Sequence, residues 1–185
     1  LKINFFQKLK WQLSSLFSFG FKGIYKSFGV EEFIRPVISK EMSIGAIKIR
    51  NSFFKKKVSH QDIINFQINK IWIGDLIYDT YLKSRLIPTF EVSDKDFQIF
   101  FKEFLELFLY WQEYLKTNKV SQIIGIHACY SYGIPLRIGM KTGIPSYVIN
   151  VRAVMKINKR IPTMYGDFKF FKKDFSIMKK KFKRN

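Results

Sequence analysis

Hydrophobic positions recur along this chain at helical and strand-like spacings, and these spacings predict its elements. The strongest helical pattern follows Ser93 and runs to about Thr117. Its apolar face consists of Phe97, Phe100, Phe101, Phe104, Leu107, Phe108, Trp111 and Leu115. Asp96 lies three residues after Ser93, so we expect a helix start that resembles a capping box. This helix is the longest predicted element, and we expect it to pack on a sheet.

The stretch 120–150 has the pattern of a strand, a loop, a helix and a second strand. Ser121 to Ile126 is a short Ile-rich run typical of a buried strand, and Ser146 to Ile149 forms the second strand. Pro135 fits the first turn of the helix between them. Such units build parallel sheets with helices on both faces. The sequence therefore predicts an α/β fold.

Weaker patterns predict the remaining elements. The predicted helices are 1–19, 21–28, 41–57, 74–85 and 167–183, and the predicted strands are 32–39 and 66–73. Residues 59–65 fit either a short helix or a turn. The helix over 1–19 is amphipathic with flanking lysines, which fits either a membrane interface or packing within the protein. We divide the chain into an N-terminal helical segment (1–30), an α/β domain (31–165) and a basic C-terminal helix and tail (166–185).

Charge changes this picture because it is concentrated at both ends of the chain. Of 33 Lys/Arg and 14 Asp/Glu, residues 1–57 carry 12 and 3, residues 58–151 carry 9 and 9, and residues 152–185 carry 12 and 2. A nucleic-acid-binding domain usually carries its charge on the folded core, which is neutral here. Basic ends fit anionic lipid or a phosphorylated substrate. The single cysteine, Cys129, excludes an internal disulfide and fits a reducing compartment.

Two strand-to-helix corners carry the candidate chemistry. One is Gly74-Asp75 and the other is the loop that begins at His127. Ligands of parallel sheets bind at the carboxyl ends of strands, so we expect both corners along one sheet edge. His127 is the candidate acid/base group. The candidate binding residues are Gly74, Asp75, Tyr78, Asp79, Tyr130, Tyr132, Gly133 and Arg137.

Each candidate also has a purely structural interpretation. His127 could be hydrogen-bonded within its loop, and Asp75 could cap its own helix. Arg137 could reach a phosphate or lie solvated on the surface. The tyrosines could stack on a sugar ring or pack in the core.

No motif for nicotinamide, ATP or zinc chemistry is present. The sequence lacks G-x-G-x-x-G, G-x-x-x-x-G-K-[ST] and G-x-S-x-G, and its two histidines have no metal-ligand spacing. No run is long and apolar enough to predict a transmembrane helix. We therefore expect neither a metal nor a cofactor.

Three segments resemble a known family in order and spacing. Residues 73–82 (IGDLIYDTYL), 127–138 (HACYSYGIPLRI) with Gly143-Ile144-Pro145, and 165–168 (YGDF) resemble bacterial surface-carbohydrate and capsular-polysaccharide biosynthesis proteins. The resemblance implies the N-terminal, acceptor-side half of a glycosyltransferase with two Rossmann-like domains, the GT-B arrangement. It also implies metal-independent sugar transfer from a nucleotide-sugar, which is a co-substrate, and a C-terminal domain outside this chain.

The prediction is therefore a glycosyltransferase-like protein of cell-surface polysaccharide assembly. It would transfer a sugar to a glycan or lipid-linked acceptor, in the cytoplasm at the inner membrane face, with the basic ends near anionic lipid. The alternative is a non-catalytic module that binds a saccharide or lipid carrier. A nucleic-acid binder is less favoured, because no recognised binding motif accompanies the charge.

Overall fold

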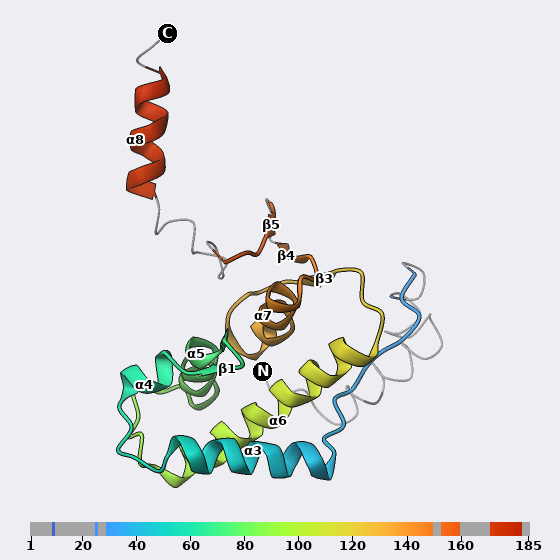
Figure 1. Cartoon of the computed structure of the whole chain (residues 1–185), viewed down its shortest axis with the longest axis vertical. Helices are drawn as coiled ribbons and strands as arrows, with labels where there is room; N and C mark the ends of the chain where they lie inside the picture. Colours follow the sequence, from blue (N-terminus) through green and yellow to red (C-terminus); the bar gives the residue numbers. More distant parts are fainter. Residues whose placement is uncertain (1–8, 10–24, 26–28, 150–152, 160–170, 183–185) are drawn as a thin grey trace. The chain divides into compact units, whose positions relative to one another are not determined.

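The computed structural model describes residues 9, 25, 29–149, 153–159 and 171–182. The chain divides into two compact units, residues 1–36 and 37–185. The predicted helices over 1–19 and 21–28, and the segment 165–168, lie outside the described residues apart from Leu9 and Tyr25, which are helical. The fold below is that of the second unit, with its elements in chain order in Figure 1.

Helix α6 supplies the largest share of the buried hydrophobic side chains. Helix α6 (Lys95–Thr117) packs along α3 (Lys40–Phe53) (Figure 1). Five α6 side chains bury completely or nearly so: Phe97, Phe101, Phe104, Leu105 and Phe108. The rings of Phe53 and Phe101 stack at 5.2 Å. Each buried phenylalanine contributes about 1.5–3 kcal/mol, so this helix pair anchors the unit. The predicted helix from after Ser93 to about Thr117 is confirmed, but the expectation that it packs on a sheet is wrong, because its main contacts are with other helices.

The helix starts differ from the expected caps. Helix α6 has Asp94 at its N-cap and no capping hydrogen bond from a side chain, so a capping box at Ser93 is wrong. The capping box forms instead at α4 (His60–Ile64), where Ser59 and Asp62 bond reciprocally. The motif needs correct backbone geometry as well as spacing.

Residues 66–73 form a hairpin rather than one strand. Strands β1 (Gln67–Ile68) and β2 (Ile71–Trp72) pair antiparallel. Asn69 and Lys70 both have positive φ, 51° and 62°, as a two-residue hairpin turn with the right twist requires. The alternating pattern predicted extended backbone correctly but could not show the reversal at Asn69.

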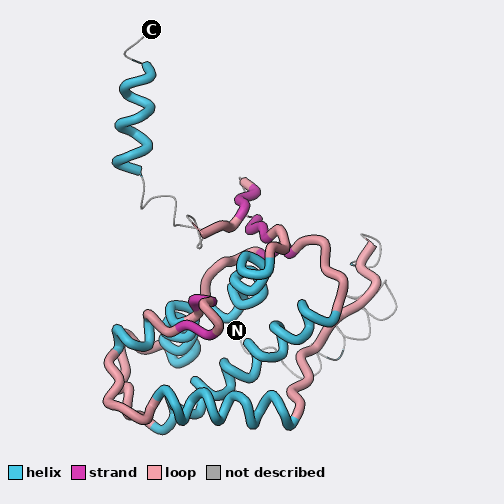
Figure 2. The backbone as a smooth tube through the Cα atoms, in the orientation of Figure 1, coloured by secondary structure: helices cyan, strands magenta, loops and turns pink. Residues whose placement is uncertain are grey.

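The second sheet contains the predicted β-α-β unit. Strands β3 (Ile123–Gly125) and β4 (Ser146–Ile149) run parallel, and β5 (Val154–Lys156) pairs antiparallel with β4. Figure 2 shows the strands in magenta. Helix α7 (Gly133–Thr142) connects β3 to β4 and packs on both. A Cβ at Gly139 would lie 2.5 Å from Ser146 Oγ, so this glycine permits the close contact.

The fold is thus mixed α/β with a small three-stranded mixed sheet flanked by helices. The predicted strand over 32–39 is wrong. Those residues belong to no helix or strand, and Pro36 cannot donate a backbone hydrogen bond. The last described element is α8 (Phe171–Phe182), inside the helix predicted over 167–183. No helix among the described residues is both long and apolar enough to cross a membrane.

Candidate functional site

The two predicted corners meet, but not at one sheet edge. Strand β2 precedes α5 (Gly74–Arg85) and belongs to the hairpin, while β3 precedes the His127 loop and belongs to the other sheet. The expectation of a shared sheet edge is therefore wrong. Instead, α5 packs directly against η1 (Tyr130–Tyr132), the single 3-10 turn that leads into α7. Helix-to-helix contact brings the corners together.

A buried ion pair joins the corners. Arg137 Nη2 donates to Asp75 Oδ2 at 2.6 Å, and Nη1 donates to the Trp72 carbonyl at 3.3 Å. The guanidinium also stacks 4.5 Å from the centroid of the Trp72 ring. Arg137 is only 1% exposed. It is therefore neither a solvated surface residue nor placed for direct contact with a phosphate in this arrangement.

Burial opposes ionisation of both partners. Desolvation raises the pKa of Asp75, against the attraction and hydrogen bond of Arg137. Desolvation also lowers the pKa of Arg137, and Asp75 counters that shift. A guanidinium stays charged at neutral pH despite such a shift. Asp75 Oδ1 and Arg137 Nε are buried without a hydrogen-bond partner among the described residues.

Two glycines permit the close approach. A Cβ at Gly74 would lie 2.0 Å from the Ile63 carbonyl oxygen, so only glycine fits between α4 and α5. A Cβ at Gly133 would lie 2.7 Å from the Ala128 carbonyl oxygen and 2.9 Å from Leu76 Cδ2. Both glycines are buried. Their role in this structure is packing, which places the functional side chains around them.

An open groove lies beside the ion pair. It has a volume of about 710 Å³, and its lining residues come from α5, the segment after it and η1: Asp79, Leu82, Lys83, Leu86, Ile87, Pro88 and Tyr130. Lys83 Nζ lies 4.1 Å from the centroid of the Tyr130 ring and 6.0 Å from that of Tyr132. Lys83 makes no ion pair with a described residue. The groove therefore offers a cation on aromatic rings.

Two groove residues hold a costly backbone conformation. Leu86 and Tyr130 have φ of 54° and 56°, in the left-handed region. For a non-glycine residue this costs about 1–2 kcal/mol. Leu86 is the left-handed C-cap of α5, where its own N–H and that of Ile87 both donate to the Leu82 carbonyl, so the helix end explains its conformation. Strain like that of Tyr130 concentrates at ligand-binding sites.

Burial raises the pKa of two groups near the groove. Partial burial raises the pKa of Asp79. Burial also raises the pKa of the Cys129 thiol, helped by the negative charge of Asp79 and opposed by Lys83. These shifts show that Asp79, Lys83 and Cys129 share one electrostatic environment.

His127 lies next to this cluster. It is half-buried, and its ring centroid is 6.5 Å from that of Tyr132. Its Nδ1 atom is buried without a hydrogen-bond partner in the described part of the chain. The structure therefore shows no hydrogen bond at Nδ1 that would fix the His127 ring within its loop.

Of the predicted site residues, Asp79 and Tyr130 line the groove. Asp75 and Arg137 form the buried ion pair, Gly74 and Gly133 pack between elements, and Tyr132 lies close to His127. The Tyr78 ring lies 5.4 Å from Phe90 and 6.0 Å from His60, and it does not line the groove. Sequence reasoning missed Lys83 and Leu86. Lys83 continues the four-residue spacing of Asp75 and Asp79 on α5, so the sequence already indicated that it lies on the same helix face.

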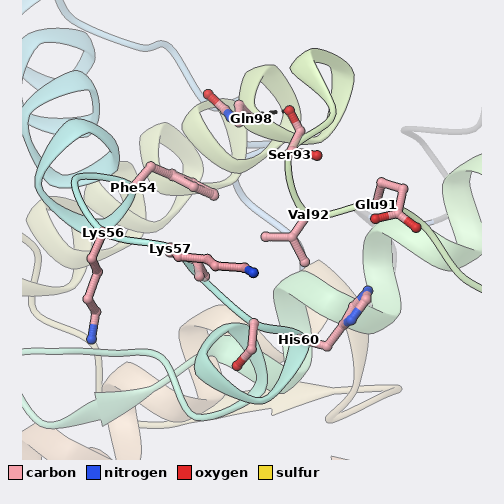
Figure 3. A pocket seen from close by; sticks show the side chains of 10 residues that line it. Phe54, Lys56, Lys57, His60, Glu91, Val92, Ser93 and Gln98 are labelled. Carbon is pink, nitrogen blue, oxygen red and sulfur yellow. Dashed lines mark hydrogen bonds between the residues drawn. The ribbon is translucent and has the colours of Figure 1, made fainter.

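A second hollow of about 390 Å³ lies near the start of α4 (Figure 3). Lys57 extends between Val92 and His60 in this view. His60 Nε2 lies 2.7 Å from the Phe90 carbonyl oxygen, and the two rings are 5.2 Å apart, so contacts within the protein hold the imidazole. The charged residues of this hollow are exposed. It has no buried polar group directed at a ligand, and we assign it no function.

Comparison with known proteins does not assign this chain to a family. No family model, no curated protein and no solved structure matches this chain. Among the described residues, no group of three or more His, Cys, Asp or Glu side chains could hold a metal ion. The groove is therefore the candidate functional site.

Proposed function

We propose that this chain is the acceptor-side, Rossmann-like half of a sugar-transferring protein of cell-surface polysaccharide assembly. The observation that supports this most is the groove in which Lys83 lies over Tyr130, with Asp79 on the same helix face. An aromatic ring stacks on a sugar face, a carboxylate accepts bonds from hydroxyls, and a free ammonium attracts phosphate. A phosphorylated saccharide or a lipid-linked sugar pyrophosphate matches all three groups.

The reaction we propose needs one proton acceptor. A base takes the proton from the acceptor hydroxyl while that oxygen attacks the anomeric carbon of the nucleotide-sugar. The bond between this carbon and the phosphate oxygen breaks, and the nucleoside diphosphate leaves with the electron pair. The nucleotide-sugar would be held by a second domain, and no metal or cofactor enters the step.

The proposed base is His127, and the structure adds Asp79 as a rival. Histidine titrates near neutrality, and His127 lies beside Tyr132. Asp79 lines the groove itself, and its pKa is raised towards the range useful for a base. Asp79 lines the groove and His127 does not, and paired substitutions separate the two assignments.

The test measures transfer of labelled sugar from nucleotide-sugars to membrane lipid in cells that express the natural full-length protein. His127→Gln should abolish transfer. Asp79→Asn should weaken acceptor binding but leave the transfer rate at saturating acceptor unchanged. The reverse result assigns the base to Asp79. Transfer that survives both substitutions would exclude both residues as the base. Transfer no greater than in cells that lack the protein would reject the enzyme hypothesis and leave a saccharide-binding module.

A further inference from the structure

Helix α8 carries a stripe of exposed apolar side chains. Phe175, Met178 and Phe182 are 56%, 56% and 72% exposed. Spacings of three and four residues place them on one face of the helix. At twelve residues the helix is about 18 Å long. Exposed apolar side chains scattered singly need no explanation, but a stripe on one face does.

Positive charge surrounds this stripe. Lys172, Lys179 and Lys180 of α8 are exposed, and they make no ion pair with a described residue. In sequence, residues 171–185 contain seven Lys/Arg and one Asp. An apolar stripe beside lysines is typical of a helix that lies in the plane of a membrane interface.

We propose that α8 binds the surface of an anionic lipid bilayer, with Phe175, Met178 and Phe182 between the headgroups. The long lysine side chains extend past the stripe and keep their ammonium groups at the level of the lipid phosphates. Charge complementarity thus selects lipid as the partner. Nucleic acid would use the lysines but leave the apolar stripe in water, because base stacking uses aromatic platforms on grooves and sheets.

The inference does not depend on sugar transfer. It concerns a different element from the groove, and it is tested with vesicles that contain no saccharide. A failed vesicle experiment would leave the groove proposal intact, and a failed transfer experiment would leave this one intact. Where both hold, α8 brings the groove to a lipid-linked acceptor.

The chain offers a matched pair of variants. Met178 and Ile177 are neighbours with the same exposed fraction, 56%, but Ile177 lies roughly 130° around the helix from the centre of the stripe. Met178→Ser removes an apolar group from the stripe. Ile177→Ser makes a comparable change away from it, so exposure is controlled, and helix content is compared separately by circular dichroism.

The experiment is flotation of the full chain with vesicles of phosphatidylcholine and phosphatidylglycerol in equal parts, and with phosphatidylcholine alone. We expect binding to the anionic vesicles only, falling as salt rises. Met178→Ser should weaken binding several-fold and the pair Met178→Ser/Phe182→Ser by at least about tenfold. Ile177→Ser should bind as the wild type does. Circular dichroism checks that the variants keep their helix content.

Three results would overturn the proposal. One is absent or salt-insensitive binding, or equal binding to both vesicle types. Another is equal behaviour of Met178→Ser and Ile177→Ser. The third is a lowered melting temperature of Met178→Ser with unchanged vesicle binding, which would show that protein covers the stripe. Tight binding of a single-stranded oligonucleotide without vesicle binding would assign the lysines to nucleic acid.

Discussion

Arg137 and Asp75 lie 62 residues apart in sequence, yet their side chains meet at 2.6 Å in a buried ion pair. This pair joins the α5 corner to the α7 corner, and the groove lies beside it. Removing one partner leaves a buried charge without compensation.

Asp75→Leu should therefore lower the free energy of unfolding by about 3–5 kcal/mol, towards the lower end because the Asp75 side chain is 18% exposed. The double variant Asp75→Leu/Arg137→Met removes both charges and should recover most of that loss. Urea denaturation measures both. Lys116→Gln breaks an exposed pair of 4.0 Å with Glu113 and should change stability by less than about 0.5 kcal/mol. A double variant no better than the single one would contradict this account of the pair.

Gly74 and Gly45 predict opposite effects of the same substitution. Gly74→Ala places Cβ 2.0 Å from a backbone oxygen of Ile63 and should destabilise by about 1–3 kcal/mol. Gly45, inside α3, meets only the end of the Leu109 side chain at 3.2 Å. Since Leu109 can shift, Gly45→Ala should be neutral or stabilise by up to about 1 kcal/mol through helix propensity. Thermal melts of the two variants compare their stabilities. A Gly74→Ala variant as stable as the wild type would contradict the close packing of α4 on α5.

Replacing Leu86 by glycine should raise stability and weaken sugar-phosphate binding. Leu86→Gly relieves the left-handed backbone at φ 54° and should stabilise by up to about 1 kcal/mol, after the added freedom of the unfolded chain is counted. Gly143→Ala is the reciprocal control, because Gly143 has φ 87° and open space around it; it should cost about 1 kcal/mol. If Leu86 is retained for the groove, Leu86→Gly should also weaken sugar-phosphate binding in calorimetry. Unchanged binding would remove Leu86 from the site.

The hydrogen bond of Glu106 with Ser43 joins α6 to α3, and we expect its contribution to stability to be lost in acid. It accepts hydrogen bonds from Lys102 at 2.7 Å and Ser43 at 2.5 Å. Burial would raise the pKa of Glu106, but these bonds outweigh it and lower the pKa below the ordinary 4.5. The ionised form therefore stabilises the fold above pH 4.5, and this contribution is lost as pH falls through the lower folded pKa. Glu106→Gln should thus be less stable than wild type at pH 7, and urea midpoints should show the difference shrinking in acid. A difference independent of pH would refute this assignment.

Elements with a strong periodic pattern could be predicted from the sequence. Helix α6 and the β3-α7-β4 unit are found where the pattern placed them. The strand over 32–39 failed because a strand needs a partner, which composition does not show. The hairpin at Asn69 was missed because its turn lacks the glycine that usually marks it.

The candidate site was predictable only in part, because its geometry depends on long-range contacts. The pattern placed Asp75, Asp79 and Tyr130 at strand-to-helix corners, and these corners do meet. It could not show that Arg137 is buried against Asp75, since local spacing places Arg137 beside Lys141 and carries no information on a partner in another helix. The left-handed backbone of Leu86 is the C-cap of α5, and the sequence did not mark it because glycine usually occupies such a position.

The central claim is that the two corners form a groove for a sugar phosphate. The most direct test is an NMR titration of the full chain with N-acetylglucosamine 1-phosphate, in the wild type, Lys83→Gln and, as an exposed control, Lys141→Gln. We predict amide shifts that cluster at Asp79, Lys83 and Tyr130, that weaken at least several-fold in Lys83→Gln, and that persist in Lys141→Gln. Shifts confined to the hollow at Lys57 and His60, or unchanged by Lys83→Gln, would contradict the account.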